Sequence, residues 1–208
     1  MGHRIRIDPA NFDPAALDPA VDALRQGGVV AYPTDTLYGL AADPRDAEAV
    51  ARVFTLKGRP ETSALTLIAA DAAQAGEAAF FTARTARLAQ LVWPGPVTIV
   101  ATARAGLARE ALAGGATVGV RVPRHTIARE LARRFGFCVT ATSANRSGAP
   151  ATAAPDDVFA ALPGVDVLID GGAAPGGPPS TIVDASGEVL RLIREGAVPW
   201  NRVLESQQ

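Results

Sequence analysis

The residues best able to bind a charged ligand follow the ends of predicted helices and strands. Lys57 and Arg59 come at the end of a predicted helix, and Lys57 is the only lysine among 20 lysine and arginine residues. Because lysine is a compact point charge that arginine does not reproduce, we expect Lys57 to meet an anion. The alternative is a lysine left by chance on a helix surface, where the helix dipole favours a cation anyway.

Two further groups of polar residues follow apolar runs. Residues 34–36 (TDT) come directly after Val29–Tyr32, and residues 142–148 (TSANRSG) follow Val139 and Thr140. Ligands of open α/β sheets bind beyond the carboxyl ends of strands, and hydroxyl, amide and backbone N–H groups can form a nest for anions. An ordinary turn and a plain Ser/Asn/Gly loop are the alternatives.

Arginines at strand ends complete the set of chemical groups. Arg121 ends a predicted strand, where a permanent charge is costly without an anionic partner. Arg191 and Arg194 belong to another strand pattern, and solvated charge is the alternative for both. Cations and neutral donors without an evident nucleophile suit a polyphosphate together with a carboxylate, because adenylyl transfer rests on positioning and charge stabilisation.

Other classes of site lack their motifs. The Gly-rich stretch 171–179 is not followed by GK[ST], so it is not a phosphate-binding loop of the Walker type. With nine residues, it is expected to be a mobile loop over a site. The sequence has no HExxH, no GxSxG and no cluster of metal ligands. We expect Cys138, between Phe137 and Val139, to be a small core residue.

Composition narrows the class of protein further. The chain has 208 residues, 48% apolar and 20% charged, with a net charge of −1. These values are typical of one globular domain, and they disfavour nucleic acid as the main partner. No run approaches the roughly 18 apolar residues of a membrane span, and Met1–Asp8 has no apolar stretch of a signal peptide. With one cysteine, the protein is expected to be cytoplasmic.

Short apolar runs alternate with helical patterns, which predicts an α/β fold with a twisted mixed sheet flanked by helices. Strands are predicted at 4–7, 29–32, 65–69, 97–103, 117–122, 139–143, 167–170, 180–184 and 189–193. Helices are predicted at 18–26, 45–56, 71–79, 82–92 and 126–135, the last with Thr126 as its N-cap.

The motifs in this order resemble the YrdC-like family of threonylcarbamoyl-AMP synthases, in its short bacterial, TsaC-type form. They are PTDTLYGLA (33–41), KGRP (57–60), WPGPVT (93–98), VRVPRH (120–125), TSANRSG (142–148), STIVD (180–184) and IREGAV (193–198). The resemblance implies a single YrdC-like domain at 15–200 with a concave ligand cleft. A strand and lead-in at 1–14 precede it, and a frayed tail at 201–208 follows.

The resemblance also implies a reaction and the residues that serve it. L-Threonine, bicarbonate or CO2 and ATP would give threonylcarbamoyl-AMP and pyrophosphate, with Mg2+ carried by ATP and no metal site on the protein. The product would feed the downstream transferase machinery of tRNA t6A modification. ATP would be held by Lys57, Arg59, Thr117, Ser143, Asn145 and Arg194, with Lys57 and Arg59 as the catalytic pair. L-Threonine would be held by Thr34, Arg121 and Ser180.

One segment departs from the family pattern, and two other functions stay open. Many members have Pro-Leu after KxRP and a His soon after, whereas this chain has residues 64–68 (ALTLI), which bears on amino-acid specificity. The main alternative is a non-catalytic RNA-binding or accessory module with a weak tRNA contact, since Arg121, Arg124, Arg129, Arg133 and Arg134 form a local basic patch. Carbamoyl transfer, as in hydrogenase-maturation proteins, is the third option.

Overall fold

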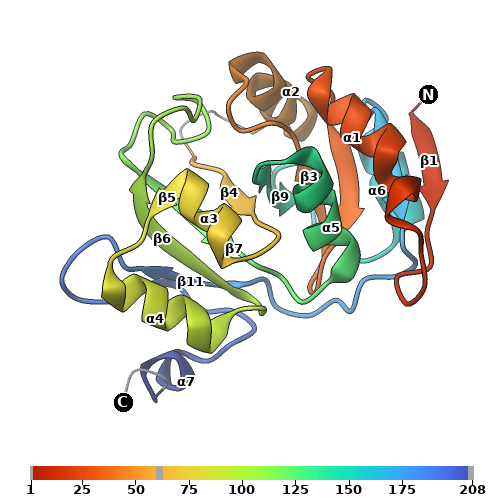
Figure 1. The fold of residues 1–208 in the computed structure, drawn as a ribbon. Coiled ribbons are helices and arrows are strands. Elements are labelled where there is room, and N and C mark those ends of the chain that lie inside the picture. Colours follow the sequence, from red (N-terminus) through yellow and green to blue (C-terminus); the bar gives the residue numbers. More distant parts are fainter. Residues whose placement is uncertain (1, 60–62, 206–208) are drawn as a thin grey trace.

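The computed structural model describes residues 2–59 and 63–205, and its strands form two mixed sheets flanked by helices (Figure 1). The first sheet has five strands in the order β1 (His3–Arg6), β10 (Val167–Asp170), β2 (Val30–Pro33), β3 (Tyr38–Ala41) and β9 (Thr142–Ser143). The second has seven: β12 (Arg191–Arg194), β11 (Thr181–Asp184), β6 (Val97–Ala103), β7 (Thr117–Arg121), β4 (Thr66–Ile68) and β8 (Val139–Thr140) in order, with β5 (Ala79–Phe80) beside β6. The predicted α/β class is confirmed, with two sheets in place of one.

The first sheet is covered by helices on both faces. Its strands alternate between two cores: Val30 and Tyr32 pack with one, and Val29 and Ala31 with the other. The first core contains α1 (Asp18–Arg25) and α5 (Thr126–Phe135). The short helix η1 (Pro14–Leu17) directly precedes α1 in the chain. The second core contains α2 (Ala47–Lys57) and α6 (Pro155–Ala161).

The second sheet is covered by helices on one face, and this asymmetry creates the site. Val97, Ile99 and Ala101 of β6 pack in the cores that include α3 (Ala72–Ala78), α4 (Ala83–Val92) and α7 (Trp200–Glu205). Because side chains alternate along a strand, Thr98 points to the opposite face. That face is turned toward the first sheet, and it lines the pocket described below.

The ends of α2 place the cations that follow it. The Asp46 side chain caps the N-terminus by accepting from the backbone N–H groups of Glu48 (2.9 Å) and Ala49 (3.2 Å). The helix ends at Gly58, whose φ of 59° is the left-handed conformation that favours glycine. Lys57 is therefore the last helical residue, and Arg59 leaves the helix in a new direction.

Several elements differ from the sequence prediction. The predicted strand 139–143 is two strands, because β8 belongs to the second sheet and β9 to the first. Strand β3 and helix α6 were not predicted from the sequence. Residues 201–205 of the expected frayed tail belong to α7 (Trp200–Glu205), with Val203 buried, while 206–208 and Pro60 of the KGRP motif lie outside the described residues.

The predicted N-cap of α5 is wrong. The helix occupies the predicted range, but its N-cap is His125, which makes no side-chain capping bond. The Thr126 hydroxyl instead donates to the carbonyl oxygen of Pro9 at 3.0 Å. Thr126 therefore anchors the N-terminal segment to the helix in place of capping it.

Candidate functional site

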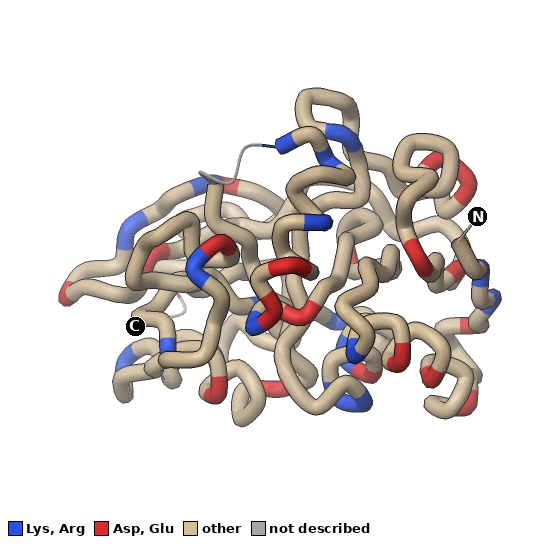
Figure 2. The backbone as a smooth tube through the Cα atoms, turned by 90° about the horizontal axis from the view of Figure 1, so that it is seen from above, with Lys and Arg blue, Asp and Glu red and all other residues tan. Residues whose placement is uncertain are grey.

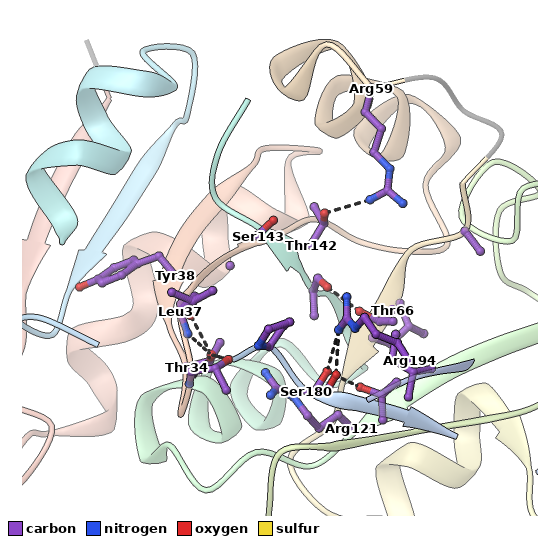
Figure 3. Close-up of a pocket in the computed structure, with 18 residues that line it drawn as sticks. Thr34, Leu37, Tyr38, Arg59, Thr66, Arg121, Thr142, Ser143, Ser180 and Arg194 are labelled. Carbon is purple, nitrogen blue, oxygen red and sulfur yellow. Dashed lines mark hydrogen bonds between the residues drawn. The ribbon is translucent and has the colours of Figure 1, made fainter. Parts of the chain in front are cut away.

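A pocket of about 230 Å³ lies between the open face of the second sheet and the β2–β3–β9 side of the first (Figure 3). Strands β4, β6, β7, β9 and β11 contribute to its wall, as do the loops that follow β2 and α2. The lining residues are Thr34, Thr36, Leu37, Tyr38, Gly39, Arg59, Ala64, Thr66, Leu67, Thr98, Arg121, Ala141, Thr142, Ser143, Pro179, Ser180, Ile182 and Arg194.

The charge of this lining is positive. It contains Arg59, Arg121 and Arg194, and no acidic side chain lines it among the described residues. Burial lowers the pKa of Arg59, and burial together with the positive charge of Arg121 lowers the pKa of Arg194. Both shifts reflect cations held out of water without a compensating anion, so the pocket favours an anionic ligand.

Two of the arginines are held by neighbouring oxygens. Arg59 Nη1 donates to Thr142 Oγ1 at 3.2 Å, and Arg194 Nη2 donates to the carbonyl oxygen of Ser180 at 2.8 Å. The Ser180 hydroxyl in turn lies 3.0 Å from Thr98 Oγ1. These bonds to neutral acceptors fix the two guanidinium groups on different sides of the pocket (Figure 3) and leave their charge uncancelled.

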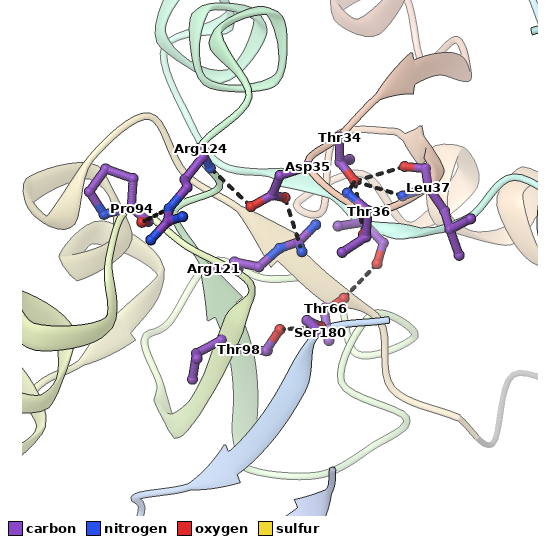
Figure 4. Close-up of polar contacts among 12 residues, drawn as sticks. Thr34, Asp35, Thr36, Leu37, Thr66, Pro94, Thr98, Arg121, Arg124 and Ser180 are labelled. Atoms are coloured by element: carbon purple, nitrogen blue, oxygen red, sulfur yellow. Dashed lines mark hydrogen bonds and ion pairs between the residues drawn. The ribbon is translucent and has the colours of Figure 1, made fainter. Parts of the chain in front are cut away.

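Arg121 has the anionic partner that its position requires. Its Nη1 lies 3.3 Å from Asp35 Oδ1, and the two side chains are only 8% and 11% exposed. Asp35 Oδ2 also accepts from the backbone N–H of Arg124 at 3.1 Å (Figure 4). Asp35 is absent from the pocket lining, so it contacts Arg121 from behind.

Lys57 is buried beneath the loop that follows β9. It is 4% exposed, and its Nζ donates to the carbonyl oxygen of Ser143, to the carbonyl oxygen of Asn145 at 2.8 Å and to Asn145 Oδ1 at 3.3 Å. The Lys57 carbonyl accepts from the backbone N–H of Ser147 at 2.7 Å. The surface alternative for Lys57 is therefore wrong, and its ammonium holds the 143–147 loop in place.

Burial and the charge of Arg59 lower the pKa of Lys57 to about 8. The ammonium therefore gives up its proton far more readily than an exposed lysine does.

The Asn145 amide also holds the 143–147 loop in place, because its Nδ2 donates to the carbonyl oxygens of Arg146 (3.0 Å) and Ala149 (2.5 Å).

The structure brings most of the predicted site residues together. Thr34, Arg59, Arg121, Ser143, Ser180 and Arg194 line the pocket. Lys57 and Asn145 lie behind Ser143, and Thr117 lies at the start of β7 outside the lining. The Thr34 hydroxyl donates to the carbonyl oxygen of Leu37 at 2.7 Å, so its proton is already used within its own loop.

Several lining residues had no individual role predicted from the sequence, although Thr142 belongs to the 142–148 segment named as a candidate anion nest. Thr66, Thr98 and Thr142 place hydroxyl groups at the pocket, and Ala64, Thr66 and Leu67 belong to the segment that departs from the family pattern. Their place in the motifs could have identified two of them, since Thr98 ends WPGPVT and Thr142 begins TSANRSG. Threonine is common in strands, so residue type alone did not separate these positions from ordinary strand residues.

Two other expectations concern the Gly-rich loop 171–179, predicted to lie over a site, and Cys138, predicted to be a core residue. In the loop 171–179, Ala174 N donates to the Ala153 carbonyl and Gly176 N to the Thr36 carbonyl, both at 2.8 Å, and only Pro179 reaches the pocket. Cys138 is fully buried, and this burial raises the pKa of its thiol to about 12, as suits a core residue.

Three of the five arginines in the predicted basic patch have acidic partners, and one of these is the Arg121–Asp35 pair described above. Arg133 Nη1 contacts Glu130 Oε2 at 2.5 Å, and Arg134 pairs with Asp18. Figure 2 shows basic and acidic positions interspersed along the chain. These ion pairs offset part of the positive charge with which the patch could attract nucleic acid.

Within residues 2–59 and 63–205, no group of three or more His, Cys, Asp or Glu side chains could hold a metal ion. Over the same residues, no helix has both the length and the apolar character needed to cross a bilayer. Both findings concern the described part of the chain alone.

Comparison with known proteins gives the pocket its context. The model of the family Sua5/YciO/YrdC, described as "Telomere recombination", matches residues 22–196. The chain belongs to the Sua5/YciO/YrdC family. Among relatives of this Sua5/YciO/YrdC chain, the threonylcarbamoyl-AMP synthase of Halorhodospira halophila is 46% identical over 67% of this chain and 73% of its own length. That of Chromohalobacter salexigens is 42% identical over 83% and 94%.

A solved structure of the same family matches the whole fold. Sua5 of Pyrococcus abyssi, in a crystal structure with L-threonine, gives a TM-score of 0.91 at 32% sequence identity. The match covers 99% of this chain and 60% of that one. This Sua5/YciO/YrdC chain therefore spans somewhat more than half the length of that longer relative.

Proposed function

We propose that this chain is a threonylcarbamoyl-AMP synthase, which converts L-threonine, bicarbonate or CO2 and ATP into threonylcarbamoyl-AMP and pyrophosphate. The observation that carries the proposal is a pocket lined by three arginines, five threonines and two serines with no acidic side chain among the described lining residues. Such a lining suits a ligand set with a carboxylate and a triphosphate. The names of the relatives and the threonine-bound Sua5 structure support it.

The chemistry asks for positioning more than for a reactive side chain. The threonine amine takes up CO2 to give a carbamate and a proton. A carbamate oxygen then attacks the α-phosphorus of ATP, the bond to the β-phosphate bridging oxygen breaks, and pyrophosphate leaves. We propose that the enzyme acts here as a nucleotidyltransferase, in which fixed cations and hydroxyl groups hold the reactants and stabilise the charge that develops.

We assign the amino acid to the end of the pocket at Arg121. Its guanidinium would pair with the threonine carboxylate, because a planar fork of N–H groups matches a carboxylate well. Thr34 and Ser180 lie on either side in the lining and would contact the rest of the amino acid. The nearby segment with Ala64, Thr66 and Leu67 would then influence whether serine is accepted in place of threonine.

We assign ATP to the part of the pocket that Arg59 and Arg194 border from different sides. These two guanidinium groups would contact the triphosphate directly, and Ser143 would add a hydroxyl group. Lys57 and Asn145 would act through the loop that they brace, with the Lys57 charge supporting the phosphates from beneath Ser143. Thr117, outside the lining, would meet the nucleotide only if ATP extends along β7.

Three further assignments complete the proposal. Mg2+ would enter with ATP, since the described residues offer no carboxylate cluster of their own. The product is a reactive mixed anhydride, so a downstream transferase of t6A modification must receive it before water does. ATP and tRNA are both abundant in the cytoplasm, where we place the reaction.

The test is pyrophosphate release from ATP by the purified chain, with Mg2+, with and without bicarbonate, across a panel of amino acids. The proposal predicts release that requires both bicarbonate and L-threonine. Release with serine as well would point to the segment at 64–68 as the cause of relaxed specificity. If folded protein releases no pyrophosphate with any amino acid, the synthase assignment is wrong.

A further inference from the structure

The ion pair between Arg121 and Asp35 joins the two sheets behind the pocket. Arg121 ends β7 of the second sheet, and Asp35 lies in the loop between β2 and β3 of the first. The pair is almost completely buried, with 8% and 11% of the two side chains exposed. A buried charge pair costs desolvation and is weak support for stability, so a pair at this place calls for another explanation.

The loop that carries Asp35 is fixed before any ligand binds. Thr34 Oγ1 accepts from the backbone N–H groups of Thr36 (3.2 Å) and Leu37 (3.3 Å) and donates to the Leu37 carbonyl oxygen at 2.7 Å (Figure 4). One hydroxyl therefore closes the turn on both sides of Asp35. The Asp35 carboxylate is held on its other oxygen by Arg124 N at 3.1 Å.

The negative charge of Asp35 is directed at Arg121 more than at its other basic neighbours. Arg124 contributes only its backbone N–H, because its guanidinium Nε donates to the Pro94 carbonyl oxygen at 3.2 Å. Burial lowers the pKa of His125 although Asp35 opposes the shift, so this imidazole is uncharged at neutral pH. Arg121 is thus the cation that faces the carboxylate.

The contact between the two groups is incomplete in a way that leaves room for a ligand. Asp35 Oδ1 and Arg121 Nη1 are 3.3 Å apart, yet neither atom has a hydrogen-bond partner among the described residues. The guanidinium has five N–H donors in a rigid fork. Because Asp35 lies behind the guanidinium and Arg121 lines the pocket, donors that Asp35 does not face remain for an anion in the pocket.

We propose that Asp35 is a positioning residue that dedicates Arg121 to the carboxylate of the amino-acid substrate. It holds one side of the guanidinium so that the remaining donors face the amino acid, and it keeps Arg121 away from the ATP phosphates. Without this anchor, Arg121 would be free to join Arg59 and Arg194 on the triphosphate. The inference rests on the proposed function, since it assumes that threonine and ATP bind in the pocket together, with the threonine carboxylate at Arg121.

The test is Asp35→Asn, assayed by pyrophosphate release for the KM of L-threonine and of ATP. Asparagine retains an oxygen for Arg124 N but loses the charge that faces Arg121. We expect the KM of threonine to rise about tenfold to a hundredfold, as for the loss of one charged contact, while the KM of ATP changes less than about threefold. Inhibition by L-threoninamide, which lacks the carboxylate, should be equal in the two proteins.

Asp166→Asn is the matched control. Asp166 Oδ2 also bridges an arginine and a backbone N–H, those of Arg52 (2.8 Å) and Val29 (2.7 Å), away from the pocket. We expect both KM values to stay at the wild-type level in this variant. An equal rise for both substrates in Asp35→Asn, or weaker inhibition by threoninamide, would show a structural role and overturn the inference.

The two proposals fail in different ways. If the wild-type chain shows no threonine-dependent release, the synthase assignment is wrong and the role of Asp35 falls with it. If the wild type is active and Asp35→Asn keeps its threonine KM, only the positioning role is overturned. Should Asp35→Asn not fold, Asp35→Glu replaces it, because the charge remains but the carboxylate moves; an unchanged threonine KM in that variant also overturns the inference.

Discussion

At the scale of single residues, Lys57 places a buried ammonium among three oxygen atoms of one loop. The carbonyl oxygens of Ser143 and Asn145 and the Asn145 side-chain oxygen converge on its Nζ. An ammonium can point three hydrogens at convergent acceptors, whereas a guanidinium spreads its donors over a flat fork. Charge is therefore only part of what this position requires.

Lys57→Arg is expected to lower the turnover of ATP about tenfold or more. The larger guanidinium would not fit the buried space of the ammonium. It would displace the 143–147 loop, and with it Ser143, which lines the pocket. The measurement is kcat for pyrophosphate release. The matched control is Arg52→Lys on the same helix, where the side chain is exposed and the rate should not change. Wild-type turnover by Lys57→Arg would refute this view of the lone lysine.

The affinity for ATP is expected to fall as pH rises through about 8. The pKa of Lys57 is lowered to about 8 by burial and by Arg59, so its positive charge is complete below that pH and lost above it. An arginine at this position stays charged throughout. Binding of ATP, measured by calorimetry across this range, should therefore weaken in the wild type more than in Lys57→Arg. Parallel pH profiles would exclude Lys57 as the source.

Residue type predicted that Arg121 needs an anion, but it did not identify the anion. Asp35 follows Thr34 in a segment whose sequence is compatible with a ligand loop or a plain turn. The pairing depends on the approach of two sheets, which no local pattern reports. The same holds for Lys57, whose special position was predicted although its contact with the 143–145 loop was not.

At the scale of elements, β7 places a glycine beside threonines that line the pocket. Arg121 and Gly119 lie two residues apart and so point to the same face of the strand. A Cβ at Gly119 would lie 3.0 Å from Thr98 Cγ2 and 3.2 Å from Thr66 Cγ2, both of which belong to lining residues. The absence of a side chain here leaves those threonines in their places at the pocket.

Gly119→Ala is expected to reduce the free energy of unfolding by about 1–3 kcal/mol through overpacking. It should also raise the KM of threonine, because Thr66 and Thr98 would be pushed toward the pocket. Urea denaturation and steady-state kinetics measure the two effects. Gly76→Ala in α3 is the control, since a Cβ there meets nothing within 4 Å and should stabilise the helix. A Gly119→Ala protein with wild-type stability and KM would contradict this account.

Element prediction succeeded where the pattern was long and failed where a strand changed partners. The predicted helix at 126–135 coincides with α5, whose apolar residues recur at helical spacing. The run 139–143 read as one strand because its apolar and hydroxyl residues continue without a break. In the structure, Ala141 separates β8 in one sheet from β9 in the other. Strand β3 was missed because its four residues follow a turn and include Gly39.

At the scale of the whole molecule, the pocket exists because two sheets meet with one face left uncovered by helices. The sequence predicted a mixed α/β fold, but strand partners far apart in the chain decide whether strands form one sheet or two. Net charge also belongs to this scale. With a total of −1 and interspersed charges, the molecule has no global field for nucleic acid, whereas the described lining of the pocket carries three arginines and no acidic side chain.

This distribution predicts different salt dependences for the two functions considered. Threonine-dependent ATP turnover should change little between low and moderate ionic strength, because buried contacts are weakly screened. Binding of tRNA, followed by fluorescence anisotropy, should be weak and should disappear as salt rises. Tight tRNA binding that survives moderate salt would favour the RNA-binding alternative.

The most direct test of the central claim is the fate of labelled carbon. Purified chain would be incubated with ATP, Mg2+, L-threonine and 13C-bicarbonate, and the nucleotide products would be analysed at once by mass spectrometry. The account predicts an adenylate that carries both threonine and the label, formed together with pyrophosphate and absent without threonine. Formation of AMP and pyrophosphate with no labelled adenylate at any time, or an adenylate of threonine without the label, would contradict it.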